Sequence, residues 1–175
     1  MSFRDDLLAR FRWIGGHADI LGLFAEGGFL VAASETLAAP FEAVDIAKVA
    51  AVEARGFILG TAVAMHLGVG FVPIRKAGAI HPGPKAVRQA GPDWRGNQPT
   101  LTIQRAALRS NERVLLVDDW IETGSQALAA RALIEDCGAQ YAGLSVLVDQ
   151  SSEEEVRNTL LPVAYVVSSV ELPSQ

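Results

Sequence analysis

The stretch that decides the fold is residues 113–130, RVLLVDDWIETGSQALAA. It opens with four consecutive aliphatic residues, 114–117, a pattern typical of a strand that is buried on both faces of a sheet. Asp118 and Asp119 follow at the point where such a strand should end. A turn of small residues then leads into a run of helix formers from Gln126 to Glu135. We therefore expect a strand, two acids, a turn and a helix in direct succession.

The turn, Thr123-Gly124-Ser125-Gln126, suits a phosphate group. Backbone N–H groups and the positive end of a helix dipole point out of a turn of this kind, and hydroxyl groups add further donors. Gly124 lets the backbone approach a ligand closely. The two acids cannot be phosphate ligands, because like charges repel. They suit a ligand with hydroxyl groups, or a metal ion that bridges to it.

This combination resembles the phosphoribosyl-pyrophosphate (PRPP) motif of the type I phosphoribosyltransferases. That motif is a hydrophobic strand, two acids, two apolar residues and then Ala-Thr-Gly-Gly-Thr or a near variant. The resemblance implies that Asp118 and Asp119 hold the ribose hydroxyls of PRPP and stabilise positive charge at its anomeric carbon. It implies that the 5′-phosphate is bound by the four residues of the turn, Thr123, Gly124, Ser125 and Gln126. The alternative is a doubly wound fold whose strand merely ends in two surface acids.

Two departures from the motif matter. Ser125-Gln126 stands in place of Gly-Thr, and Glu122 stands in place of Ala. Hypoxanthine–guanine phosphoribosyltransferases carry an Asp at a similar position, facing the purine N7. By that resemblance, Glu122 faces the nucleobase and acts as the general base that removes its proton. The alternative is that Glu122 is a surface residue.

A second strand–helix–strand unit precedes this motif. Lys48–Val52 is predicted to be a strand, 57–67 a helix stopped by Gly68, and 69–74 the next strand. Such a unit implies a parallel sheet with a right-handed crossover. Ligands of these sheets bind beyond the carboxyl ends of the strands. Charged residues lie at these ends: Glu53, Arg55, Arg75, Lys76, Asp118 and Asp119.

The segments 52–60, VEARGFILG, and 70–78, GFVPIRKAG, resemble the adenine phosphoribosyltransferase branch of the family. In that branch an Arg-Gly turn and a basic pair after the next strand bind pyrophosphate. The resemblance gives these roles to Arg55 and Gly56, and to Arg75 and Lys76. The alternatives are that Arg55 pairs with Glu53 or another nearby acid, and that Lys76 is only solvated.

The region 77–104 is expected to be a flexible lid that ends in a strand at 101–104. Its first part, 77–100, is polar, irregular and rich in Gly and Pro, and a loop of this length is usually functional. Two features of the adenine branch are absent. The acid of a Glu-Tyr-Gly segment has no counterpart in 94–97, and His17 stands near the place of a hood aromatic residue. His17 either stacks on a base or is an ordinary surface histidine.

The remaining segments complete the expected fold. Residues 2–14 predict an amphipathic helix and 35–45 a second helical run, together forming a small N-terminal hood over 1–45. Residues 141–148 and 163–167 are expected to be strands, with a short helix at 153–160 between them. The whole is an open, mostly parallel α/β sheet of about five strands with flanking helices. Asp149 and the acids at 153–155 are interpreted as solvated.

Length and composition bound the function. A chain of 175 residues predicts a single domain, and a net charge of −5 argues against a general nucleic-acid binder. The lone Cys137 and the absence of a signal peptide or membrane segment favour the cytoplasm. The resemblance implies a homodimer that takes PRPP and a purine, with Mg²⁺ bound through PRPP near Asp118 rather than by direct side-chain ligands. A PRPP-binding regulator and a PRPP synthetase-like kinase are the alternatives to a transferase.

Overall fold

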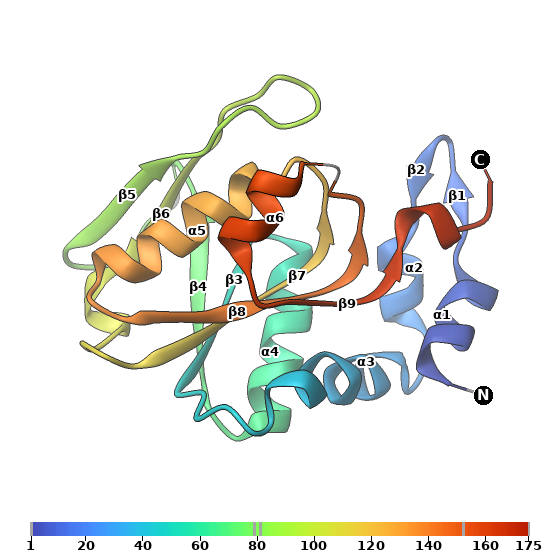
Figure 1. The fold of residues 1–175 in the computed structure, drawn as a ribbon, viewed down its shortest axis with the longest axis horizontal. Coiled ribbons are helices and arrows are strands. Elements are labelled where there is room, and N and C mark those ends of the chain that lie inside the picture. The colour runs from blue at the N-terminus through green and yellow to red at the C-terminus, as the bar shows by residue number, and fades with distance from the viewer. Residues whose placement is uncertain (1, 79, 81, 152, 175) are drawn as a thin grey trace.

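The computed structural model describes residues 2–78, 80, 82–151 and 153–174, and a seven-stranded sheet forms its centre (Figure 1). The strand order is β5-β6-β4-β3-β7-β8-β9. Five of these strands run parallel: β3 (Lys48–Val52), β4 (Gly70–Lys76), β7 (Arg113–Ile121), β8 (Gln140–Asp149) and β9 (Val163–Ser168). An antiparallel pair, β5 (Lys85–Gln89) and β6 (Thr100–Gln104), extends the sheet beyond β4. The expected open, mostly parallel α/β sheet is confirmed, with seven strands rather than about five. β6 matches the strand expected at 101–104, whereas β5 lies in the part of the lid that was expected to be irregular.

Helices cover both faces of the sheet (Figure 1). α3 (Phe29–Ala38) and α4 (Arg55–Leu67) pack on one face, where Leu115 and Val117 of β7 join their core. α5 (Ser125–Asp136) and α6 (Glu154–Leu160) pack on the other face, against Val114 and Leu116. Successive side chains of β7 thus alternate between two cores, as the uninterrupted aliphatic run predicts.

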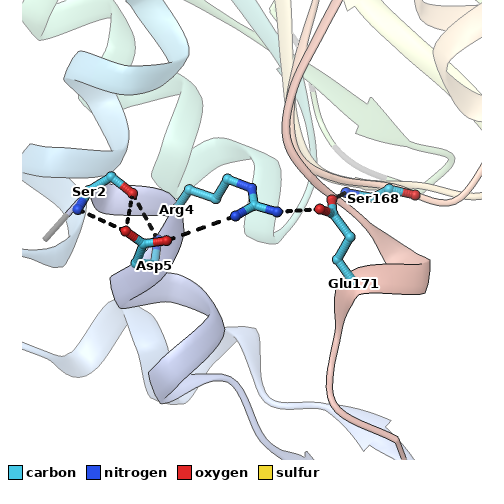
Figure 2. A network of polar contacts seen from close by, with 5 residues as sticks. All are labelled: Ser2, Arg4, Asp5, Ser168 and Glu171. Atoms are coloured by element: carbon cyan, nitrogen blue, oxygen red, sulfur yellow. Dashed lines mark hydrogen bonds and ion pairs between the residues drawn. The ribbon is translucent and has the colours of Figure 1, made fainter.

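The N-terminal region forms a small layer beside the carboxyl end of the sheet. It consists of α1 (Phe3–Arg10), the two-stranded hairpin β1–β2 (Trp13–Ile14 and His17–Ala18) and α2 (Ile20–Ala25). The C-terminal 3₁₀ turn η3 (Ser169–Glu171) ties this layer down, since Arg4 pairs with Glu171, which also accepts the N–H of Ser168 (Figure 2). The indole nitrogen of Trp13 donates to the carbonyl oxygen of Pro173 at 2.8 Å. Both ends of the chain therefore position the hairpin.

The expected helical run over 35–45 is wrong in its bounds. α3 begins after Gly28 and ends at Ala38, and a 3₁₀ turn η1 (Ala39–Phe41) follows. Pro40 accounts for the early end, because it has no backbone N–H to continue the hydrogen bonds of the helix. The expected helix over 2–14 is also shorter, since Gly15 and Gly16, both at positive φ, make the tight turn of a hairpin instead.

The interpretation of Asp149 as a solvated residue is wrong. Only 4% of its surface is exposed, and it pairs with Arg157 of α6 at 3.1 Å. Its other oxygen accepts the backbone N–H of Ser151. A carboxylate at the end of a buried strand is held in place here by a neighbouring helix. The helix itself was expected, at 153–160, but its ion pair with Asp149 was not.

Among the residues that the structure describes, we find no helix with the length and apolar character that a membrane-spanning helix needs.

Candidate active site

The two acids of β7 lie at the N-terminus of α4. The backbone N–H of Asp119 donates to Oδ1 of Asp118 at 2.9 Å, and Nε of Arg55 lies 3.0 Å from Oδ2 of Asp119. Gly56 makes this approach possible. A Cβ atom at Gly56 would stand 2.9 Å from Oδ1 of Asp118, closer than packing allows. The Arg-Gly sequence therefore supplies a cation and the space for a carboxylate in one turn of helix.

Both carboxyl groups are weaker acids than usual. Burial, and secondly the negative charge of Asp119, raise the pKa of Asp118 well above its ordinary value. Burial also raises the pKa of Asp119, although the Arg55 guanidinium works against this. Asp119 is 4% exposed and lies behind Arg55, whereas Asp118 is half-buried. A ligand that donates hydroxyl groups, or brings a cation, would favour the ionised form of Asp118.

The turn after β7 has the backbone of an anion site. Gly124 adopts φ +70°, which places it as the N-cap of α5. A side chain there would meet the Cγ1 atom of Val156 at 2.4 Å, so glycine is required twice over. The hydroxyl groups of Thr123 and Ser125 lie 3.1 Å apart, in hydrogen-bonding contact. N–H groups at the start of a 12-residue helix and two hydroxyls thus converge.

A cavity of about 180 Å³ opens over this turn, and we call it the turn cavity. Its lining combines Arg55, Asp118 and the turn with a segment of the expected lid. Its residues are Arg55, Asp93, Trp94, Asp118, Trp120, Ile121, Glu122, Thr123, Gly124, Ser125, Gln126, Ala127, Leu144 and Val146.

A second cavity, of about 440 Å³, adjoins it, and we call it the aromatic cavity because all three tryptophans of the chain line it. The hairpin β1–β2, the 94–95 segment and the ends of β7 and β8 form its walls. Its residues are Trp13, Gly16, His17, Ala18, Arg55, Trp94, Arg95, Trp120, Glu122 and Gln150. Four residues line both cavities: Arg55, Trp94, Trp120 and Glu122.

Glu122 stands where the two cavities meet. Its side chain is half-buried. Burial, and then the charge of Asp93, raise the pKa of Glu122, while Arg95 opposes the shift. A carboxylate with a raised pKa is a stronger base than an ordinary surface glutamate.

The basic pair, which forms the last two residues of β4, lies apart from these cavities. Arg75 and Lys76 are absent from the lining of both, and Glu53 holds this strand end. Its carboxylate accepts the backbone N–H of Lys76 at 2.6 Å and pairs with Nε of Arg75 at 3.4 Å. Of the four residues assigned to pyrophosphate, Arg55 lines the cavities, Gly56 lies against Asp118, and the other two lie at the neighbouring strand end.

One protein-family model matches most of the chain. The model of the phosphoribosyl transferase domain matches residues 34–171, which include the acids, the turn and the Arg-Gly segment. The chain belongs to the phosphoribosyl transferase domain family. The resemblance to the adenine branch of these enzymes is confirmed, and with it the assignment as a phosphoribosyltransferase rather than a kinase.

Individual phosphoribosyltransferases agree with the family assignment. An adenine phosphoribosyltransferase of Dinoroseobacter shibae is 46% identical over 132 residues, covering 75% of this chain and 72% of that protein. One of a Nocardioides species is 42% identical over 135 residues, 75% and 71% of the two chains. The structure of a Giardia lamblia APRTase with 9-deazaadenine has a TM-score of 0.86 and 31% identity, covering 97% of this chain and 98% of that one. A Rhodothermus marinus adenine phosphoribosyltransferase gives 0.83 and 31%, over 95% and 98%.

Four residues of the aromatic cavity of this phosphoribosyltransferase escaped the sequence analysis: Trp13, Trp94, Trp120 and Gln150. The indole nitrogen of Trp120 donates to the side-chain oxygen of Gln150 at 2.8 Å. A count of tryptophans was the only available signal, since three large aromatic residues in a chain with few aromatics invite the question of where they meet. His17 lines this cavity and is also exposed, so both of its interpretations stay open.

Proposed function

We propose that this phosphoribosyltransferase transfers the 5-phosphoribosyl group of PRPP to adenine and releases pyrophosphate. The observation that carries the proposal is the junction of the two cavities. One is lined by Asp118 and the anion turn, the other is lined by indole rings, and Glu122 belongs to both. A sugar phosphate in the first and a flat heterocycle in the second would meet beside a carboxylate. Adenine is the acceptor that the names of the relatives give.

The turn cavity is proposed to hold the ribose 5-phosphate part of PRPP. Thr123, Gly124, Ser125 and Gln126 bind the 5′-phosphate through N–H and hydroxyl donors at the start of α5. Asp118 and Asp119 accept hydrogen bonds from the ribose hydroxyls. They also lower the energy of the sugar cation that develops as pyrophosphate leaves.

The pyrophosphate leaving group is proposed to lie between the ends of β3 and β4. Arg55, Gly56, Arg75 and Lys76 occupy these ends, and three of them carry positive charge. Arg55 neutralises Asp119 in the structure, so PRPP must take over either the guanidinium or the carboxylate when it binds.

Mg²⁺ is proposed to enter with PRPP. Among the described residues, no group of three or more His, Cys, Asp or Glu side chains is placed to hold a metal. The oxygen of Asp118 in the turn cavity nevertheless suits this hard cation, which takes its remaining ligands from phosphates and water. When bound, the ion neutralises the charge that builds up on pyrophosphate.

Glu122 is proposed to be the general base. Its membership of both cavities supports a position beside the bond that would form between the ring nitrogen and the anomeric carbon. Its raised pKa suits the removal of the N–H proton as the nitrogen attacks.

The domain organisation and the setting of the enzyme belong to this proposal as well. Residues 1–175 form one domain, in which 1–45 are the hood and 77–104 the lid. The lid touches the turn through Thr123, whose hydroxyl lies 3.4 Å from the carbonyl oxygen of Pro92. A homodimer is proposed from the family resemblance, supported by Ile58 and Met65, two exposed apolar residues seven positions apart on one face of α4. A cytoplasmic location is proposed as well, and the free Cys137 supports it.

The experiment is a turnover screen of adenine, hypoxanthine and guanine with Mg·PRPP, with the nucleotide product and pyrophosphate both measured. The proposal expects AMP and pyrophosphate in equal amounts. If PRPP stabilises the fold but no base is consumed, the chain is a PRPP-binding regulator and the proposal is wrong.

A further inference from the structure

Gln150 occupies a defined place at the aromatic cavity. It is the first residue after β8, and its backbone N–H donates to the carbonyl oxygen of Ile121 at 2.8 Å. This bond fixes it beside the end of β7, next to Trp120 and Glu122. Gln150 itself is part of the cavity lining, although its side chain is otherwise exposed.

The hydrogen bond to Trp120 fixes the orientation of the Gln150 amide. An indole N–H can only donate, so the atom that it meets must be the carbonyl oxygen of the amide. The NH₂ group is then the part of the Gln150 side chain left to bind a ligand, and it offers two N–H donors and no acceptor.

The tryptophans strengthen this argument. The indole nitrogen of Trp13 is bonded to the carbonyl oxygen of Pro173, and that of Trp120 to Gln150. Both indole donors are therefore already bonded, and the two rings, packed on each other with centroids 6.1 Å apart, present apolar ring surface rather than a donor to a ligand. Glu122, the acid of the cavity, is an acceptor. Stacking surfaces, one acceptor and one oriented amide donor thus face the same space.

We propose that Gln150 is a specificity-determining residue for the acceptor base, and that its amide N–H donates to a ring nitrogen of the purine. The inference rests on the proposed transfer to adenine. In this arrangement Glu122 takes the proton of the attacking ring nitrogen, and Gln150 binds an unprotonated ring nitrogen at another edge. Trp120 is a positioning residue. Its indole N–H holds the oxygen of the Gln150 amide and so prevents the amide group from rotating by 180°.

The test measures kcat/KM for adenine and for 1-deaza-, 3-deaza- and 7-deazaadenine, each of which replaces one ring nitrogen by C–H. The wild-type enzyme should lose about 3–10-fold on one of these analogues, the usual worth of one neutral hydrogen bond. Gln150→Met removes the donor, and Gln150→Glu removes it while keeping an oxygen for the Trp120 indole. Both variants should treat adenine and that analogue alike.

Two further variants complete the design. Trp120→Phe removes the indole donor and frees the Gln150 amide to turn, so it should weaken the discrimination while Mg·PRPP still stabilises the fold. Gln140→Met is the matched control, because Gln140 is an exposed glutamine at the other end of β8. It should discriminate as the wild type does.

The outcomes separate the inference from the function on which it rests. Equal use of all four bases by the wild type, or unchanged discrimination in both Gln150 variants, would overturn the role of Gln150 while leaving adenine transfer intact. No PRPP-dependent transfer to adenine by the wild type would overturn the proposed function, and the inference with it.

Discussion

The two cavities of this enzyme are built in different ways. The turn cavity draws nine of its lining residues from the stretch 118–127, all of it except Asp119, and Arg55 from the next strand end. The aromatic cavity is assembled from the hairpin at 13–18, the segment 94–95, the end of β7 and Gln150. A site within one stretch fixes the order of its chemical groups along the chain. In a site assembled from distant segments, one segment can vary while the others stay the same. Here His17 and residues 94–97 are the positions at which features of the adenine branch are absent.

The largest expected effect tests whether Glu122 links the two cavities. Glu122→Gln removes the proposed base but keeps the size of the side chain, so turnover should fall by about 10²–10⁴-fold. The stabilisation by Mg·PRPP should change little, because the turn and both aspartates are intact. Steady-state rates and thermal shifts of the same preparation measure both quantities.

The control for this variant is Glu155→Gln, on the exposed surface of α6. It should leave turnover unchanged. Normal turnover in Glu122→Gln would mean that the carboxylate takes no part in the reaction and that the two cavities are joined only by proximity.

The next effect concerns the lid wall of the aromatic cavity. Trp94 is 61% exposed, and the Arg95 guanidinium lies 4.3 Å from the centroid of its ring. If Trp94 stacks on the base, Trp94→Ala should raise KM for adenine by about 5–150-fold, as expected from the ~1–3 kcal/mol of a stacked base. KM for PRPP should change less, and Trp94→Phe should restore most of the loss. A larger effect on PRPP than on adenine would assign this residue to the turn cavity instead.

The contrast between the cavities also marks how far sequence reasoning reached. The aliphatic run 114–117, the glycines and the Arg-Gly turn carry local physical requirements, so β3, α4, β7 and α5 were predicted within a few residues. Asp118 and Asp119 proved to lie inside β7, which runs on to Ile121, rather than after it. The strand continues because β8 pairs with it as far as Asp149.

The acceptor side could not be predicted in the same way. The sequence predicted that Trp13 lies in an amphipathic helix and Trp94 in an irregular loop. Neither prediction indicated which residues these two side chains contact. Their meeting depends on the hairpin at Gly15-Gly16 and on the C-terminal segment that bonds Trp13. These are contacts between residues up to 160 positions apart, which no local pattern encodes.

The smallest expected effect is the loss of stability that the Asp118 carboxylate of the turn cavity causes as pH rises. Because the folded-state pKa of Asp118 is raised, the unfolded chain ionises first as pH rises above about 4, and the free energy of unfolding falls until the folded pKa is passed. In Asp118→Asn the side chain cannot ionise, so the free energy of unfolding should not fall in this way. Each pKa unit of the shift corresponds to about 1.4 kcal/mol, and each 1 kcal/mol to about 2–4 °C in Tm.

Thermal unfolding of wild type and Asp118→Asn between pH 4 and pH 8 measures this prediction. The Tm of the variant should exceed that of the wild type at pH 7, and the difference should shrink toward pH 4. A variant that is less stable at every pH would mean that the carboxylate of Asp118 stabilises the fold, and that the site carries no cost for its function.

The most direct test of the central claim, that the β7 acids and the turn bind PRPP, is the thermal shift with Mg·PRPP in the wild type and in Asp118→Asn/Asp119→Asn. Ligand binding stabilises the folded state by RT ln(1 + [L]/Kd), so the wild-type Tm should rise with PRPP concentration. In the double variant the fold should remain and most of the shift should disappear. An undiminished shift in a folded double variant would contradict the claim and place PRPP elsewhere on the molecule.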